Sequence, residues 1–468
     1  MNKYQKIFLQ FLLVVCLTGV SCRQTTCNRY TDLYAPNNTL YTGYMDVGFN
    51  DNVTGLGFLF YTKFNATTPE EIAAAPTLIW LNGGPGASSM EGAFFENGPY
   101  RVLNISNMMV VEQNENAWTK NYNVLFIDQP IGVGFSRSAK DEYLPVNETQ
   151  VAEQFYKGLV NFYTSGCYSN AIYHKSPLFI TGESYCGKYI PNIAAEILKQ
   201  NNQTDVTGNV KIPLKGISIG DPLLDPQNQL SLLGEYGIEN NLISYSTYFQ
   251  VNNALTRMKN NLTFSRYEEA ADCYDEAMEI FMSKAFTILE NPYNYKIGPY
   301  PDQYVKHFCQ TYIQNFGFDK DHVYDSTSDK VANSLKPEIF APNGIPALVK
   351  VLEQHLPVII YNGNYDIQVN SPGISYAVNR FEWYGKQAFS ALPMNDLQMP
   401  NQQGNQEVIG SIKVYDSFIY ALINGAGHLA PYDQPESVNY LIDNFVNKTL
   451  GKQTTNQFRS FQKYAVEY

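Results

Sequence analysis

The sequence has little positive charge. It contains 32 lysines and arginines against 44 aspartates and glutamates, which gives a formal net charge of −12 at pH 7. The basic residues are scattered and form no cluster. Because a negatively charged protein is repelled by phosphate, this balance argues against nucleic acid as a partner.

Residues that bind metal ions are also few. Only 5 histidines and 7 cysteines occur among 468 residues, with no C-x-x-C pair and no mixed His/Cys cluster. We therefore expect neither a zinc site nor another metal or cofactor. Internal repeats and low-complexity blocks are missing too, and a composition of 44% hydrophobic and 16% charged residues is typical of a globular protein.

Long apolar runs are missing except at the start. Lys3 and Lys6 precede an apolar run over 7–20, and small residues follow it, which predicts a signal peptide over residues 1–22. A membrane anchor is the alternative reading, although the run is short for a span of about 20 residues. No later run reaches about 18 apolar residues, so we expect no membrane span after cleavage. The predicted location is the secretory pathway, either a lysosome or vacuole or the outside of the cell.

The glycosylation sequons agree with this route. Eight N-x-[ST] sequons predict N-linked glycans. They lie at Asn37, Asn52, Asn65, Asn104, Asn147, Asn202, Asn261 and Asn447.

Five cysteines remain outside the leader, so at least one has no partner within the chain. Cys273 and Cys309 fall in one segment and are the expected disulfide. Cys27 and Cys167 are a second candidate pair. Cys186 is expected to be free and buried.

The middle and the end of the chain alternate between buried strands and helices, which predicts a mostly parallel α/β sheet. The expected strands are 77–81, 123–128, 178–180, 214–219, 356–361 and 417–423, after an antiparallel meander over 41–64. Helices are expected over 148–163, 189–200 and 438–446. Strands vanish between 226 and 345, where helical, aromatic and charged sequence predicts a cap insertion. The core then comprises 23–225 and 346–450, with a polar tail over 451–468.

One strand ends in a turn that carries a serine. The run Gly182-Glu183-Ser184-Tyr185-Cys186 follows the strand at 178–180 and precedes a helical stretch. This is the arrangement of a nucleophile elbow, in which the turn lifts the serine Oγ out of the sheet edge. The usual elbow has glycine where Cys186 stands, so this motif alone is a weak signal.

A base and an acid complete the pattern. Of the five histidines, only His428 follows a strand of the core within a loop of small residues. Asp366 likewise comes just past a strand. The order Ser184, Asp366, His428 is the order of a hydrolase triad on such a sheet, so we predict that Ser184 attacks, His428 moves protons and Asp366 orients His428.

A glycine-rich loop follows another buried strand. Asn82-Gly83-Gly84-Pro85-Gly86 comes directly after the strand at 77–81 and exposes backbone N–H groups. In hydrolases of this kind such a loop supplies one donor of the oxyanion hole.

Five motifs follow one another along the chain: WLNGGPGASS, FFENGP, GESYCGKYIP, YNGNYD and GAGHLAP. Together they resemble the serine carboxypeptidase family of lysosomes and vacuoles, and the resemblance runs from about residue 30 to 446. The sequence segments IGDPLLDP and GKYIPNIA resemble the vitellogenic-like branch of this family. The resemblance implies an α/β-hydrolase fold with a helical cap and the release of single C-terminal residues from peptides or proteins through an acyl-enzyme.

The resemblance also implies roles for particular residues. Asn82, the Gly83 N–H, Glu96 and Glu183, with Trp80 nearby, are implied to bind the substrate carboxylate. Since carboxylates repel one another, one glutamate must be protonated, which predicts activity at acidic pH. The N–H groups of Gly84 and Tyr185 are implied oxyanion donors, and Leu429 with Val369 is implied to form the pocket for the leaving residue.

The sequence departs from the family at two positions. Ala87 stands where the family commonly has a cysteine that bridges to the cap, which puts the anchoring of the cap in doubt. Cys186 replaces a common alanine. Neither position belongs to the triad.

Other functions stay open at this point. An acyltransferase or esterase could use the same triad, and a protective or binding subunit or a secreted structural glycoprotein could keep the fold without catalysis. The oligomeric state, with a homodimer as one option, is also open.

Overall fold

The computed structural model describes residues 27–32, 34–164, 173–203, 210–287 and 289–452. The predicted signal peptide, Cys167 and residues 453–468 of the predicted tail lie outside these ranges.

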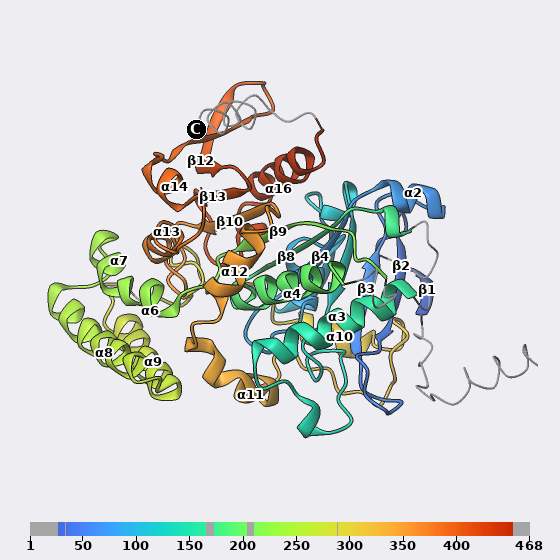
Figure 1. Ribbon diagram of the computed structural model, residues 1–468, viewed down its shortest axis with the longest axis horizontal. Helices are drawn as coiled ribbons and strands as arrows, with labels where there is room; N and C mark the ends of the chain where they lie inside the picture. Colours follow the sequence, from blue (N-terminus) through green and yellow to red (C-terminus); the bar gives the residue numbers. More distant parts are fainter. Residues whose placement is uncertain (1–26, 33, 165–172, 204–209, 288, 453–468) are drawn as a thin grey trace, which may run out of the picture.

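An eleven-stranded sheet runs through the molecule in the order β1-β2-β3-β7-β4-β8-β9-β10-β13-β12-β11 (Figure 1). Its strands are β1 Cys27–Thr31, β2 Thr39–Met45, β3 Leu56–Tyr61, β4 Thr77–Leu81, β7 Asn123–Ile127, β8 Leu178–Glu183, β9 Leu214–Gly220, β10 Val358–Gly363, β11 Asn395–Pro400, β12 Gln406–Tyr415 and β13 Phe418–Ile423. The six strands from β7 to β13 in this order are parallel, and the strands at both edges are antiparallel. A separate hairpin pairs β5 Tyr100–Ile105 with β6 Met108–Gln113. The sheet confirms the predicted fold class.

The parallel strands are apolar on both faces because both faces are covered. In β4, Ile79 and Leu81 pack into one hydrophobic cluster, whereas Leu78 and Trp80 pack into a second cluster on the opposite face. This double burial explains why the strands read as continuous apolar runs rather than as alternating patterns.

Helices supply the two covers. On one face α3 Glu148–Thr164, α4 Cys186–Asn201 and α12 Gly344–Leu352 lie side by side, and α16 Pro435–Thr449 packs against β9 on the other (Figure 1). Helix α4 begins at Cys186, earlier than predicted, and passes through Pro191 without a break. A proline in the second turn removes only one backbone hydrogen bond, and the close packing of α4 between α3 and α12 holds the helix together.

The segment 226–345 contains helices and no strand among its described residues. These helices are α6 Pro226–Gln229, α7 Leu233–Glu239, α8 Tyr245–Thr263, α9 Tyr267–Ser283, α10 Val305–Thr311 and α11 Asp329–Phe340. Figure 1 shows α7, α8 and α9 projecting together from one side of the molecule, whereas α10 packs against β5. The remaining α-helices are α2 Pro69–Ala74, α13 Ser371–Val378, α14 Lys386–Ala391 and α15 Ala430–Asp433. Within the described ranges no helix is both long and apolar enough to cross a membrane.

The predicted disulfide between Cys273 and Cys309 is wrong, because both are free and buried. Cys273 lies on α9 and packs into the cluster on the α4 face, whereas Cys309 lies on α10 in the cluster on the opposite face. Closeness in the sequence did not translate into closeness in the fold. Cys186 is free and buried, as expected.

Candidate active site

The predicted site residues gather at one edge of the sheet. Ser184 follows β8 directly, Asn82 follows β4, Asp366 follows β10 and His428 follows β13. The carboxyl ends of parallel strands meet at the same edge, which is where open α/β sheets place their ligands.

Ser184 sits on a sharp turn between β8 and α4. Its φ of 63° is left-handed, a conformation that costs a residue other than glycine about 1–3 kcal/mol. Backbone bonds hold it there: the Ser184 N–H donates to the Gly220 carbonyl at 3.0 Å, and its own carbonyl accepts from the N–H groups of Gly187 and Leu223, both at 2.9 Å. The turn is thus fixed by its neighbours on β9 and α4, as a nucleophile elbow requires.

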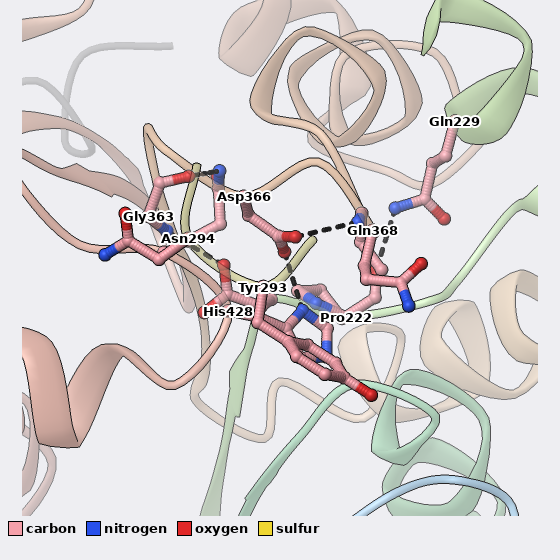
Figure 2. A network of polar contacts seen from close by, with 12 residues as sticks. Pro222, Gln229, Tyr293, Asn294, Gly363, Asp366, Gln368 and His428 are labelled. Carbon is pink, nitrogen blue, oxygen red and sulfur yellow. Dashed lines mark hydrogen bonds and ion pairs between the residues drawn. The ribbon is translucent and has the colours of Figure 1, made fainter. Parts of the chain in front are cut away.

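His428 and Asp366 are paired and buried. His428 Nδ1 lies 2.6 Å from Asp366 Oδ2, and Asp366 Oδ1 accepts from the Val369 N–H at 3.1 Å (Figure 2). Asp366 is fully buried and His428 is 4% exposed. Such a bond orients the imidazole so that Nε2 can act on a hydroxyl.

Ser184 and His428 line the same cavity, although no hydrogen bond between their side chains occurs among the described contacts. Catalytic hydrogen bonds are often long in ligand-free enzymes and tighten with substrate.

Residues of the segment 226–345 contact the loop that carries His428. The His428 N–H donates to the Tyr293 carbonyl at 2.7 Å, and the Tyr293 ring lies beside the imidazole with 5.3 Å between centroids (Figure 2). Asp433 accepts from the Gly427 N–H at 2.7 Å, from Asn294 Nδ2 at 2.8 Å and from the Tyr300 hydroxyl at 2.9 Å. Sequence reasoning missed these supports, because nothing local indicates that the loop at 291–301 reaches the histidine.

The glycine loop packs directly against the elbow. A Cβ at Gly83 would lie 2.4 Å from the Tyr185 nitrogen and 2.9 Å from the Ser184 Cβ, so no side chain fits there. Gly84 has a φ of +105°, which side chains rarely tolerate. This close approach brings the backbone of Gly83 and Gly84 beside the Tyr185 N–H, next to the nucleophile.

Backbone contacts anchor the same loop to the insertion. Ala87 and Thr327 form an antiparallel bridge, the Ser88 N–H donates to the Ser326 carbonyl at 2.9 Å, and the Ser328 N–H donates to the Gly86 carbonyl at 2.9 Å. The alanine that raised doubt about the anchoring therefore lies in a main-chain contact that needs no cysteine.

Two buried glutamates face one asparagine next to the nucleophile. Asn82 Nδ2 donates to Glu183 Oε1 at 3.0 Å and to Glu96 Oε1 at 3.1 Å. Asn82 Oδ1 in turn accepts from Trp80 Nε1 at 2.9 Å and from the Gly92 N–H at 3.0 Å. Trp80 is fully buried, so its indole orients Asn82 rather than touching a substrate.

Burial makes these glutamates hard to ionise. Desolvation raises the pKa of Glu96 to about 7, against the opposing effect of its hydrogen bond from Asn82. Desolvation and the nearby Glu96 raise the pKa of Glu183 well above its ordinary value. Because two carboxylates in contact cannot both ionise cheaply, the pair retains a proton into the neutral range.

A cavity of about 600 Å³ opens over these groups. Its floor includes Asn82, Gly84, Glu183, Ser184 and Tyr185. Helices and loops of the segment 226–345 contribute further walls, among them Tyr274, Tyr293, Tyr300, Asp302, Lys336 and Phe340. The cavity also includes Val369 and Leu429, the two residues predicted for the leaving-residue pocket, and Glu91, which was not predicted.

One further acid was missed. Asp221 directly follows β9, is fully buried and lies in a tight group with Asp366 and His428. The rule that singled out Asp366, an acid just past the end of a strand, could also have singled out Asp221.

A sequence profile of the serine carboxypeptidase family matches residues 32–448. The chain belongs to the serine carboxypeptidase family. It is a serine-type carboxypeptidase, a hydrolase that acts on peptides.

Relatives in distant organisms agree. The venom serine carboxypeptidase of Apis mellifera is 30% identical over 420 residues, which cover 87% of this chain and 84% of the relative. The serine carboxypeptidase-like 50 of Arabidopsis thaliana is 30% identical over 84% of both chains. The crystal structure of Kex1(delta)p, a prohormone-processing carboxypeptidase from Saccharomyces cerevisiae, superposes with a TM-score of 0.75 over 89% of this chain and 92% of that chain. At 23% identity, this last likeness supports the α/β-hydrolase fold.

Proposed function

We propose that this serine carboxypeptidase acts at acidic pH, with Ser184, His428 and Asp366 as its triad. The observation that carries the proposal is that the buried Glu183 directly precedes Ser184 in the chain and that both residues line one cavity. Ser184 attacks the last peptide bond, and His428 takes the serine proton and passes it to the leaving residue. The N–H groups of Gly84 and Tyr185 stabilise the oxyanion. This acyl transfer needs no metal or cofactor.

The carboxylate of the substrate binds where the protein offers donors. The Gly83 N–H and a protonated Glu183 or Glu96 each supply a hydrogen to it, and Asn82 Nδ2 supplies another by exchanging one of its two glutamate partners for the substrate. The sign of the pH dependence follows from the raised pKa values. Below about pH 7 Glu96 keeps its proton and binding is strong. As the pH rises through this value, the added negative charge repels the substrate and KM increases.

The side chain of the leaving residue occupies the pocket near Leu429 and Val369. Glu91 and Asp302 line the same cavity, and Glu91 Oε1 has no hydrogen-bond partner among the described residues. Burial and the nearby Asp302 raise the pKa of Glu91 well above its ordinary value. A long side chain with a cationic end would satisfy both acids, so we propose that the enzyme removes lysine and arginine as well as apolar residues.

The enzyme follows the secretory pathway and carries N-linked glycans. Support comes from the predicted leader and from the sequons, none of which is buried: Asn37, Asn52, Asn65 and Asn202 are exposed and the other four are half-buried. Treatment of the protein from its native source with an amidase that removes N-linked glycans should lower its mass. An unchanged mass would contradict this part of the proposal.

A peptide and its C-terminal amide test the central claim. Incubated with the enzyme at about pH 5, where the glutamates are protonated, the free acid should lose residues one at a time from its C-terminus in the mass spectrum. The amide should react far more slowly, because it lacks the carboxylate. Equal rates for both peptides, or products in which the acyl group has moved to another acceptor, would contradict the proposal.

A further inference from the structure

Asp221 is an acid with no assigned role that is fixed beneath the triad. Its N–H donates to the Tyr361 carbonyl at 2.8 Å, and its Oδ1 accepts from the Gly363 N–H at 2.9 Å. Both partners belong to β10, the strand that leads to Asp366. The Asp221 φ of 43° is left-handed, and these two contacts hold the residue in this unusual conformation. The backbone conformation therefore directs the Asp221 side chain to the end of β10.

The Asp221 carboxyl is close to the triad. One side-chain atom each from Asp221, Asp366 and His428 lie within 4.8 Å of one another, and all three residues are buried. Asp221 Oδ2 accepts no hydrogen bond from any described donor. Two buried carboxylates this close repel each other strongly, whereas a proton between them turns the repulsion into a hydrogen bond.

The hydrogen bonds differ between the two carboxyls. Asp366 has two donors, the Val369 N–H on Oδ1 and His428 Nδ1 on Oδ2, whereas Asp221 has only the Gly363 N–H on Oδ1. Asp221 Oδ2 is therefore the oxygen that is left to carry a proton between the two carboxyls.

The surroundings of Asp221 contain no compensating cation among the groups that act most strongly on it. Asp366 faces it from beyond β10, Asp433 from α15 and Glu183 from β8, while the phenols of Tyr361 and Tyr420 lie on β10 and β13. Burial, and after it the charge of Asp366, raises the pKa of Asp221 well above its ordinary value.

We propose that Asp221 is a positioning residue of the triad: as a neutral acid, it donates a hydrogen bond from Oδ2 to the Asp366 carboxylate and holds this carboxylate toward His428. The inference rests on the proposed triad. Asp221 would be a fourth residue beside the three of the triad, and it acts through Asp366 and touches no reacting atom.

Two substitutions of similar size separate donor from non-donor. Asp221→Asn keeps an acceptor for Gly363 and gives Asp366 an amide N–H, whereas Asp221→Leu gives neither. We expect kcat of the Asn variant to stay within about threefold of the parent, and kcat of the Leu variant to fall by about 10- to 100-fold with KM little changed. The rise of kcat/KM with pH, which reports His428, should stay in place in the Asn variant, since one neutral group replaces another.

An infrared difference spectrum tests the proton directly and does not depend on activity or on the Leu variant folding. The spectrum of the parent minus that of Asp221→Asn, recorded at a pH where the enzyme is active, should show the C=O band of a protonated carboxyl. The proposal is overturned if this band is missing, if the rise of kcat/KM moves down by about one pH unit in the Asn variant, or if a folded Leu variant matches the Asn variant.

The parent enzyme and Ser184→Ala serve as references for the same peptide. An active parent and an inactive Ser184→Ala variant uphold the triad whatever the Asp221 variants do. An active Ser184→Ala variant would instead remove the proposed function, and the two failures are thereby distinguishable.

Discussion

Two pairs of buried acids flank the nucleophile, and they differ in what they face. Glu96 and Glu183 share Asn82, and Glu183 borders the substrate cavity. Asp221 and Asp366 lie under His428, and neither borders that cavity. Each pair places two carboxyls where only one can ionise easily. In the mechanism that we propose, the pair at the cavity exchanges its proton with a change in substrate or pH, whereas the shielded pair supports the base. The same chemistry would then serve recognition on one side and proton transfer on the other.

The comparison has meaning only if Ser184 is the nucleophile. Ser184→Ala should lower kcat/KM on a blocked dipeptide by about 10⁴- to 10⁶-fold, because no acyl-enzyme can form. The adjacent Cys186→Ala is the matched control: Cys186 is buried outside the cavity, and burial raises the pKa of its thiol well above the ordinary value, so it should retain activity. Substantial turnover by pure Ser184→Ala protein would show that Ser184 is not the nucleophile, and the comparison of the two pairs would then fail.

The shielded pair should act on kcat. Asp366→Asn keeps the shape but favours the wrong imidazole tautomer, and in a comparable triad this change costs about 10⁴-fold. KM should change little. Steady-state kinetics on the same dipeptide measure both constants, and a loss confined to KM would show that the two pairs do not divide the work as proposed.

The pair at the cavity should act on KM and on its pH dependence. Glu96→Gln combined with Glu183→Gln replaces both titrating acids with permanent amide donors. In the parent, KM should increase about tenfold between about pH 6 and about pH 8, since the pKa of Glu96 is about 7. In the double variant KM should stay nearly level. An unchanged increase would assign the pH dependence to other groups.

The most limited effect, confined to substrates with a cationic last residue, is expected at Glu91 and Asp302, which line the cavity. Glu91→Gln combined with Asp302→Asn should lower kcat/KM about tenfold for a peptide ending in lysine, because a cation then loses its partners. A matched peptide ending in leucine is the control and should react nearly as before. The ratio of the two rates, measured in one competition mixture, sharpens the comparison by separating acids that bind a carboxylate from acids that bind a cation.

Local sequence patterns predict the sheet well. Strands of the parallel centre are continuous apolar runs because both faces are buried, and the predicted triad residues Ser184, Asp366 and His428 follow the ends of such strands. The edge strands β11 and β12 were not predicted, since many of their residues are exposed and carry little apolar signal.

Contacts between distant segments escape such reasoning. The roles of Tyr293 behind His428 and of Trp80 behind Asn82 depend on side chains that meet only in the folded protein. The error about Cys273 and Cys309 has the same origin, because the chain between α9 and α10 passes from one face of the sheet to the other. The number of residues between the two cysteines does not indicate that the chain crosses to the other face.

The main-chain bridge at Ala87 and Thr327 has a consequence for engineering. Backbone contacts tolerate changes of side chain, so this attachment of the segment 226–345 to the glycine loop does not depend on the side chains at these two positions. That segment provides much of the cavity wall, including Tyr274 and Phe340, while the sheet provides the nucleophile. A chimaera that keeps the sheet and imports a new segment should inherit the chemistry of one parent and the substrate preference of the other, which makes substrate preference a transplantable trait.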